Sequence, residues 1–165
     1  PDRYRSGNGR QCYADLEAVR VSLPTNCSTG IGARLREAWA RYRLPTAVTE
    51  AHLGCKEPEE GRRWLLEAWA EAESLRAEGV DLRAVTAWSV FGAVDWHSLL
   101  SRQEGSYEPG VFDARHDPPR PTPVAEAVRA LARTGRFQHP APPQPGWWRR
   151  PDRFFGLQDA QRRTA

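Results

Sequence analysis

Apolar residues recur at the spacing of an α-helix, i, i+3, i+4 and i+7, in three stretches of the chain. The first starts at Ala33 and is ended by Pro45, and the second lies between Pro58 and Gly79. The third starts behind Thr122, the expected N-cap, and is followed by a glycine. The apolar positions are Leu35, Ala38, Trp39 and Tyr42, then Leu65, Leu66, Trp69, Ala72 and Leu75, then Val124, Ala127, Val128 and Leu131.

Two β-branched runs flank the second helix, and each is too short to form a helix itself. Residues 46–49 read Thr-Ala-Val-Thr and end at Glu50, and residues 85–91 read Val-Thr-Ala-Trp-Ser-Val-Phe. A strand, a helix and a strand in this order predict the βαβ unit of a parallel sheet, and hence the α/β fold class. Residues 1–31 and 92–121, punctuated by glycine and proline, are expected to be long loops.

The composition changes beyond the third helix. Residues 140–145 read Pro-Ala-Pro-Pro-Gln-Pro, which is typical of a stiff, extended linker. The tail that follows carries four aromatic residues, Trp147, Trp148, Phe154 and Phe155. We therefore expect residues 1–136 to belong to one domain, and residues 137–165 to be a proline-rich linker and tail that leads to another domain.

The composition argues against several classes of function. Although the net charge is +3, nearly all of the positive charge comes from arginine spread along the chain, so no nucleic-acid partner is expected. Three cysteines without Cys-x-x-Cys spacing argue against a disulfide framework and a metal site. No apolar run approaches membrane-spanning length and no signal peptide opens the chain, which predicts a cytoplasmic protein without a membrane partner.

Candidate chemistry gathers at the predicted strand ends, where parallel sheets and barrels carry functional side chains. Glu50 ends the first strand, and Asp95 with Trp96 follows the second. A sugar site combines an aromatic platform with carboxylates that accept hydroxyl hydrogen bonds, and Trp88 with Trp96 would supply that platform. The alternatives are a solvated acidic residue at Glu50 and a large core residue at Trp88. His52 could line the same site, although a lone loop histidine is more often solvated or packed.

Three segments, in order and at matching spacing, resemble the C-terminal part of family 1 glycoside hydrolases. Residues 35–50 resemble the approach to the seventh strand, where a helix ending in R-Y precedes P-I-x-I-T-E-N-G. Residues 79–96 are similar to the eighth-strand stretch G-V-D-L-R-G-Y-x-x-W-S-L-L-D-N-F-E-W. Residues 109–113 and 120–123 are similar to the ending F-G-L-V-Y-V-D…R-x-P-K.

The resemblance implies a partial (β/α)₈ TIM barrel, contributing the last two strands with their helices, and a retaining glycosidase for β-linked O-glycosides. It implies Glu50 as the nucleophile, Trp88 as the platform under the sugar, and Asp95 with Trp96 as the pair that binds its outer hydroxyls. No cofactor is implied. Retaining chemistry needs a second carboxylic acid about 5 Å away, which the family supplies in a T-F-N-E-P motif that this chain lacks.

A complete barrel needs about 250 residues, whereas this chain has 165, starts with Pro1 and contains no methionine. The expectation is therefore a truncated chain whose partner is the missing N-terminal half of the barrel. Residues 52–55 and 147–151 look most like a bacterial subgroup in which the barrel is joined to a dTDP-4-dehydrorhamnose reductase-like domain.

Some residues depart from the family pattern. Ala51 replaces the asparagine after the nucleophile, Asp95 is one methylene shorter than the family's glutamate, and residues 92–94 replace D-N-F. These changes leave open a second hypothesis of a different class. In it the chain belongs to a non-catalytic sugar-binding or scaffolding barrel in nucleotide-sugar (dTDP-rhamnose) metabolism.

Overall fold

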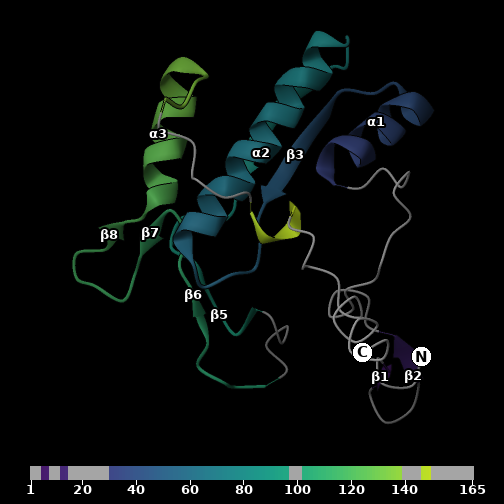
Figure 1. Ribbon diagram of the computed structural model, residues 1–165. Helices are drawn as coiled ribbons and strands as arrows, with labels where there is room; N and C mark the ends of the chain where they lie inside the picture. Colours follow the sequence, from purple (N-terminus) through teal and green to yellow (C-terminus); the bar gives the residue numbers. More distant parts are fainter. Residues whose placement is uncertain (1–4, 8–11, 15–29, 97–101, 139–145, 150–165) are drawn as a thin grey trace, which may run out of the picture. The chain divides into compact units, whose positions relative to one another are not determined.

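The computed structural model of the chain describes residues 5–7, 12–14, 30–96, 102–138 and 146–149 (Figure 1). The chain forms two units, Ser28–Ala141 and the combined segments Pro1–Cys27 and Pro142–Ala165. In the second of these, β1 (Arg5–Gly7) pairs antiparallel with β2 (Cys12–Ala14), and Trp147–Arg149 form one turn of 3₁₀ helix, η3. The loop expected over residues 1–31 thus contains a β pair, whose strands of three residues are too short for an alternating pattern to reveal. Most of the predicted linker and tail, residues 139–145 and 150–165, lies outside the described residues.

The unit Ser28–Ala141 is built on a strand, a helix and a strand. These are β3 (Thr46–Ala51), α2 (Pro58–Ala77) and β4 (Leu82–Ala87), and the two strands are adjacent and parallel. The predicted βαβ unit is therefore confirmed, but its second strand, predicted over residues 85–91, begins earlier and ends at Ala87. The register pairs Val48 with Val85 and Ala51 with Ala87, and it is irregular between these pairs, as at a β-bulge.

Helix α2 forms where the sequence carries its start and stop signals. Pro58 occupies the first turn, whose acidic residues suit the positive end of the helix dipole, and Gly79 follows the helix with a φ of 89°. The N–H of Val80 donates to the carbonyl of Leu75 at 3.0 Å, which satisfies a carbonyl of the last turn. The apolar stripe of α2 packs on β3 and β4, forming a core that includes Val48, Leu65, Ala68, Ala72, Leu75 and Leu82.

Helices α1 (Ile31–Tyr42) and α3 (Pro123–Thr134) both pack against α2 (Figure 1). The guanidinium of Arg36 on α1 donates to both carboxylate oxygens of Glu78 at the end of α2, at 2.6 and 3.0 Å. Thr122 stands at the N-cap of α3 as predicted, but its side chain does not cap the helix. Its hydroxyl instead lies 2.8 Å from the carbonyl oxygen of Gly110 and 2.9 Å from that of Val111. The third helix is therefore anchored to the loop before it.

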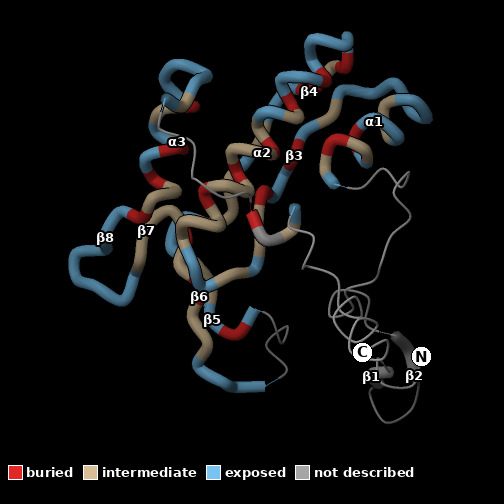
Figure 2. Tube along the Cα trace, in the orientation of Figure 1, coloured by how far each residue is buried: buried red, intermediate tan, exposed pale blue. Residues whose placement is uncertain are grey.

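The face of the β3–β4 pair that points away from α2 is exposed (Figure 2). Its side chains are small, and within the described ranges no helix or strand covers them. These exposed residues are Ala47, Thr49, Ala84 and Thr86. Parallel strands occur almost only in sheets that are covered on both faces, so this surface differs from that of a finished parallel sheet.

Residues 92–121, expected as a long loop, contain two short antiparallel pairs. β5 (Ala93–Val94) pairs with β6 (Tyr107–Glu108), and β7 (Phe112–Asp113) pairs with β8 (Arg120–Pro121). The unit is thus mixed α/β with small sheets, and none of those that the structure describes is closed. No helix in the described part of the chain is long and apolar enough to cross a membrane.

Candidate functional site

Glu50 lies near the C-terminal end of β3 with an exposed side chain. Val48 and Ala51 are buried, whereas the two residues between them are both exposed, because the bulge interrupts the alternation of the strand. Among the described residues, none donates a hydrogen bond to the Glu50 carboxylate or forms an ion pair with it. The predicted nucleophile is therefore an accessible carboxylate at the strand end where the sequence analysis expected it.

Three aromatic rings lie close together beside this strand end. The N–H of Trp88, the residue after β4, donates to the carbonyl of Ala51 at 3.4 Å, which ties Trp88 to the end of β3. The Trp88 and Trp96 rings are 5.2 Å apart between centroids, and the His52 ring lies 4.5 Å from that of Trp88 at an angle of 62°. The structure thus brings together Trp88, Trp96 and His52, close in the chain to Glu50.

Asp95 is buried and organises a loop. Its exposed fraction is 5%, and its carboxylate accepts hydrogen bonds from the backbone N–H groups of Glu104, Gly105 and Ser106 at 3.0, 3.1 and 2.7 Å. The N–H of Asp95 itself donates to the carbonyl of Ser106 at 2.8 Å. Both oxygens therefore accept hydrogen bonds from the loop, and the sugar-binding role of Asp95 that the resemblance implies stays a prediction.

We predict that Asp95→Ala will destabilise the protein by about 2–4 kcal/mol, because three backbone donors lose a charged acceptor. Asp95→Asn keeps the size of the side chain and one acceptor oxygen, so about half of that loss is expected. Chemical denaturation of the two variants measures both values. Equal stability of Asp95→Ala and the wild type would contradict this role for Asp95.

His52 and Glu108 form a partly buried polar pair beside Trp88, and sequence reasoning missed this pair. His52 Nε2 is 3.1 Å from Glu108 Oε2, and the two side chains are 25% and 8% exposed. Glu108 comes from β6, 56 residues further along the chain, so no local spacing indicated the pair. The only signal available was His52 itself, two residues after Glu50.

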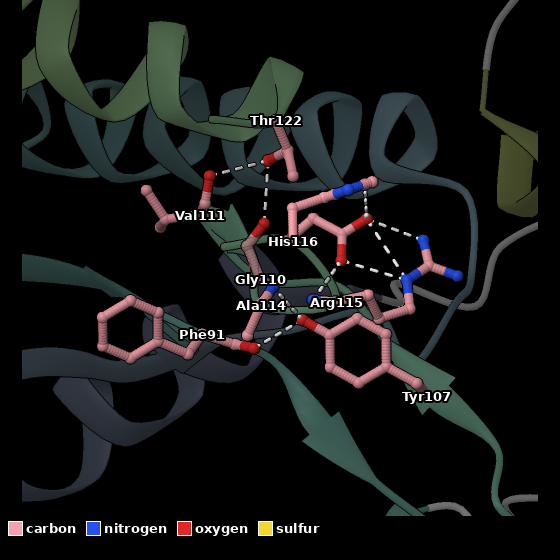
Figure 3. Close-up of polar contacts among 9 residues, drawn as sticks. Phe91, Tyr107, Gly110, Val111, Ala114, Arg115, His116 and Thr122 are labelled. Atoms are coloured by element: carbon pink, nitrogen blue, oxygen red, sulfur yellow. Dashed lines mark hydrogen bonds and ion pairs between the residues drawn. The ribbon is translucent and has the colours of Figure 1, made fainter. Parts of the chain in front are cut away.

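A network of hydrogen bonds holds the loops around β6 in place (Figure 3). The hydroxyl of Tyr107 donates to the carbonyl of Phe91 at 2.6 Å and accepts from the N–H of Ala114 at 2.9 Å. Arg115 pairs with Asp113 at 2.7 Å and lies over the Tyr107 ring, 5.1 Å from its centroid. Hydrogen bonds from Arg115 hold the pKa of Asp113 at about 2, below its usual 3.8. These contacts fix the strand that carries Glu108.

Comparison with protein-family models, with curated proteins and with solved structures finds no match for this chain.

Two hollows border the His52–Glu108 pair. One of about 30 Å³, between His52, Trp88 and Pro109, is large enough for water only. The other, open and about 450 Å³, has Glu108 at its wall together with loop residues Gly54, Cys55, Lys56, Glu104, Gly105 and Ser106. Burial raises the pKa of the Cys55 thiol, which lowers its fraction of reactive thiolate at neutral pH.

This arrangement suits recognition of a ring with one apolar face and polar edges. Trp88 and Trp96 offer apolar ring surfaces tilted by 37° to each other, His52 offers a polar edge, and Glu50 offers an exposed carboxylate at the adjacent strand end. Within the described residues no group of His, Cys, Asp and Glu side chains could hold a metal ion.

Proposed function

We propose that this chain forms part of a retaining glycosidase, of the family 1 glycoside hydrolase type, that acts on β-linked O-glycosides. The observation that carries the proposal concerns the adjacent C-terminal ends of the parallel strands β3 and β4. An exposed glutamate, Glu50, lies at the end of β3, and the Trp88–Trp96 pair follows β4. Functional groups at the C-terminal ends of adjacent parallel strands are the usual arrangement in barrel enzymes.

The partial barrel is proposed from the unfinished state of the β3–β4 sheet. Its strands are parallel and joined by a helix that covers one face, as in a (β/α)₈ barrel, while the small side chains of the other face are exposed. In the proposed barrel this face lines the interior, and further strands from a longer polypeptide pair with the open edges. Residues 137–165 then lead towards a reductase-like domain.

In the proposed reaction, a carboxylate oxygen of Glu50 attacks the anomeric carbon, and the bond from that carbon to the leaving oxygen breaks. A second carboxylic acid, from outside this chain, protonates the leaving oxygen and then removes a proton from the water that hydrolyses the glycosyl ester. Trp88 stacks under the sugar ring. A phenol with a low pKa leaves without protonation, so such a substrate tests Glu50 independently of the acid.

The test is covalent labelling of the protein, expressed with whatever sequence its gene encodes on either side. The protein is incubated with the 2,4-dinitrophenyl 2-deoxy-2-fluoro derivatives of β-glucose and β-galactose, and intact and peptide masses are recorded. We expect one adduct, on Glu50, and none in Glu50→Gln. The control Glu37→Gln changes an exposed glutamate on α1 and should label normally. Folded protein that takes no label would overturn the proposal.

A second candidate function is favoured by the burial of Asp95. Because its carboxylate serves the loop amides, one hydroxyl-binding group of the family is turned away from the ligand. A barrel that binds a sugar, or a sugar nucleotide of the dTDP-rhamnose type, without cleaving it would show this change. Sugar binding by calorimetry, together with the absence of label on Glu50, would support this candidate instead.

A further inference from the structure

A sugar on the Trp88 platform needs a polar group at the edge of the platform, because stacking alone does not distinguish one hydroxyl arrangement from another. Asp95, the residue expected in this role, is 5% exposed and holds three loop amides. In this structure both of its carboxylate oxygens are engaged by that loop. The candidate for contact with a hydroxyl is therefore a second polar group beside Trp88.

His52 is the side chain in that position. Its ring centroid is 4.5 Å from that of Trp88, and the two planes meet at 62°, so the imidazole stands edge-on beside the indole. A quarter of its side chain is exposed. Its Nε2 faces Glu108, while no group among the described residues bonds to its Nδ1.

Glu108 defines which nitrogen of His52 is available. An ionised carboxylate can only accept hydrogen bonds, so the 3.1 Å contact with Oε2 favours the tautomer with its hydrogen on Nε2. In that tautomer Nδ1 is an acceptor. Glu108 is 8% exposed and lies in the wall of the open hollow, so the carboxylate side of the pair borders space that a ligand can enter.

We propose that His52, oriented by the buried Glu108, accepts a hydrogen bond at Nδ1 from one hydroxyl of the sugar that stacks on Trp88. His52 is then a specificity-determining binding residue, and Glu108 is its positioning residue. The inference deepens the proposed function and rests on it, since it assumes that a sugar occupies the Trp88 platform.

The test compares kcat/KM of wild type and His52→Phe on 2,4-dinitrophenyl β-glucoside, β-galactoside and the monodeoxy analogues of the better substrate. Phenylalanine keeps the ring beside Trp88 and removes Nδ1. We expect a loss of about tenfold or more on the parent sugar, which corresponds to one hydrogen bond, and less than threefold on the analogue lacking the contacted hydroxyl. Equal losses on all sugars, or no loss, would overturn the role of His52.

Glu108→Gln keeps the size of the side chain, and because an amide both donates and accepts hydrogen bonds, either tautomer of His52 can pair with it. In this variant we expect the same hydroxyl-dependent pattern with a smaller loss, and ¹⁵N spectra of the His52 ring that no longer show Nε2–H alone. The wild-type spectra provide a measurement that needs no folded variant. The Nδ1 signal should move when the free parent sugar is added, whereas a signal unaffected by saturating sugar would count against the proposal.

Fluoro-sugar labelling distinguishes failure of the proposed glycosidase activity from failure of the proposed role of His52. Label on Glu50 with unselective His52→Phe kinetics means that the glycosidase stands and the role of His52 fails. No label, with an Nδ1 signal that responds to sugar, means that the reaction fails and the recognition role stands. No label and no response of Nδ1 overturns both.

Discussion

Glu50→Ala is expected to lower turnover of 2,4-dinitrophenyl β-glycosides by at least about 10³-fold, which corresponds to roughly 4 kcal/mol of transition-state stabilisation. The substitution removes the atom that forms the covalent bond to the anomeric carbon, so no remaining group can replace it. The fold should be unaffected, because the Glu50 side chain is exposed and lies outside the buried core.

Addition of azide tests whether the activity lost in Glu50→Ala is that of a nucleophile. In Glu50→Ala the space of the missing carboxylate admits azide, which attacks from the same side as Glu50 and gives an α-glycosyl azide. We expect azide to restore part of the lost rate and the product to have inverted configuration, as shown by NMR. Glu37→Ala, at an exposed position of α1, should keep wild-type rates and show no response to azide. A β-configured product would contradict the assignment of Glu50.

Local signals along the chain predicted the βαβ unit well. Pro58 and Gly79 bracket α2 in the structure as they do in the sequence pattern, and the apolar positions of that helix form the core with β3 and β4. These elements depend on residues within a few turns of each other, so the chain carries their signals locally. The start of α1 was placed two residues late, at Ala33 instead of Ile31, which is an ordinary uncertainty at a helix end.

The candidate site could be predicted only where it coincides with a strand end. Glu50 was found because it ends a recognisable strand, and Trp88 because it lies within the second predicted strand, residues 85–91. The pairing of His52 with Glu108 joins residues 56 positions apart, and it depends on how the loop after β4 folds back. That fold depends in turn on Asp95 and Tyr107, whose bonds to backbone groups leave no periodic pattern in the sequence. The hydrogen bonds from the loop amides also account for the burial of Asp95.

Gly110→Ala is expected to destabilise the protein by about 3 kcal/mol or more, the upper range for forcing an extra atom into a filled space. A Cβ on Gly110 would collide with the carbonyl oxygen of Ser89 and with the backbone nitrogen of Gly92. Neither neighbour can rotate away, because both are backbone atoms. The N–H of Val111 also donates to the carbonyl of Ser89 at 2.9 Å, so any shift that relieves the clash breaks this bond as well.

The close approach at Gly110 joins the segment after Trp88 to the segment that carries Glu108. If this contact is what keeps the loops together, Gly110→Ala should also weaken sugar binding while leaving the helices intact.

Gly61→Ala provides a matched control. Gly61 lies in α2, where an added Cβ would make ordinary contact with Val124 at 3.6 Å, and alanine is the better helix former by about 1 kcal/mol. Thermal denaturation followed by circular dichroism should therefore show a lower Tm for Gly110→Ala and an unchanged or higher Tm for Gly61→Ala. Equal Tm values for the two variants would mean that the loops tolerate separation, and the site would then depend on β3 and β4 alone.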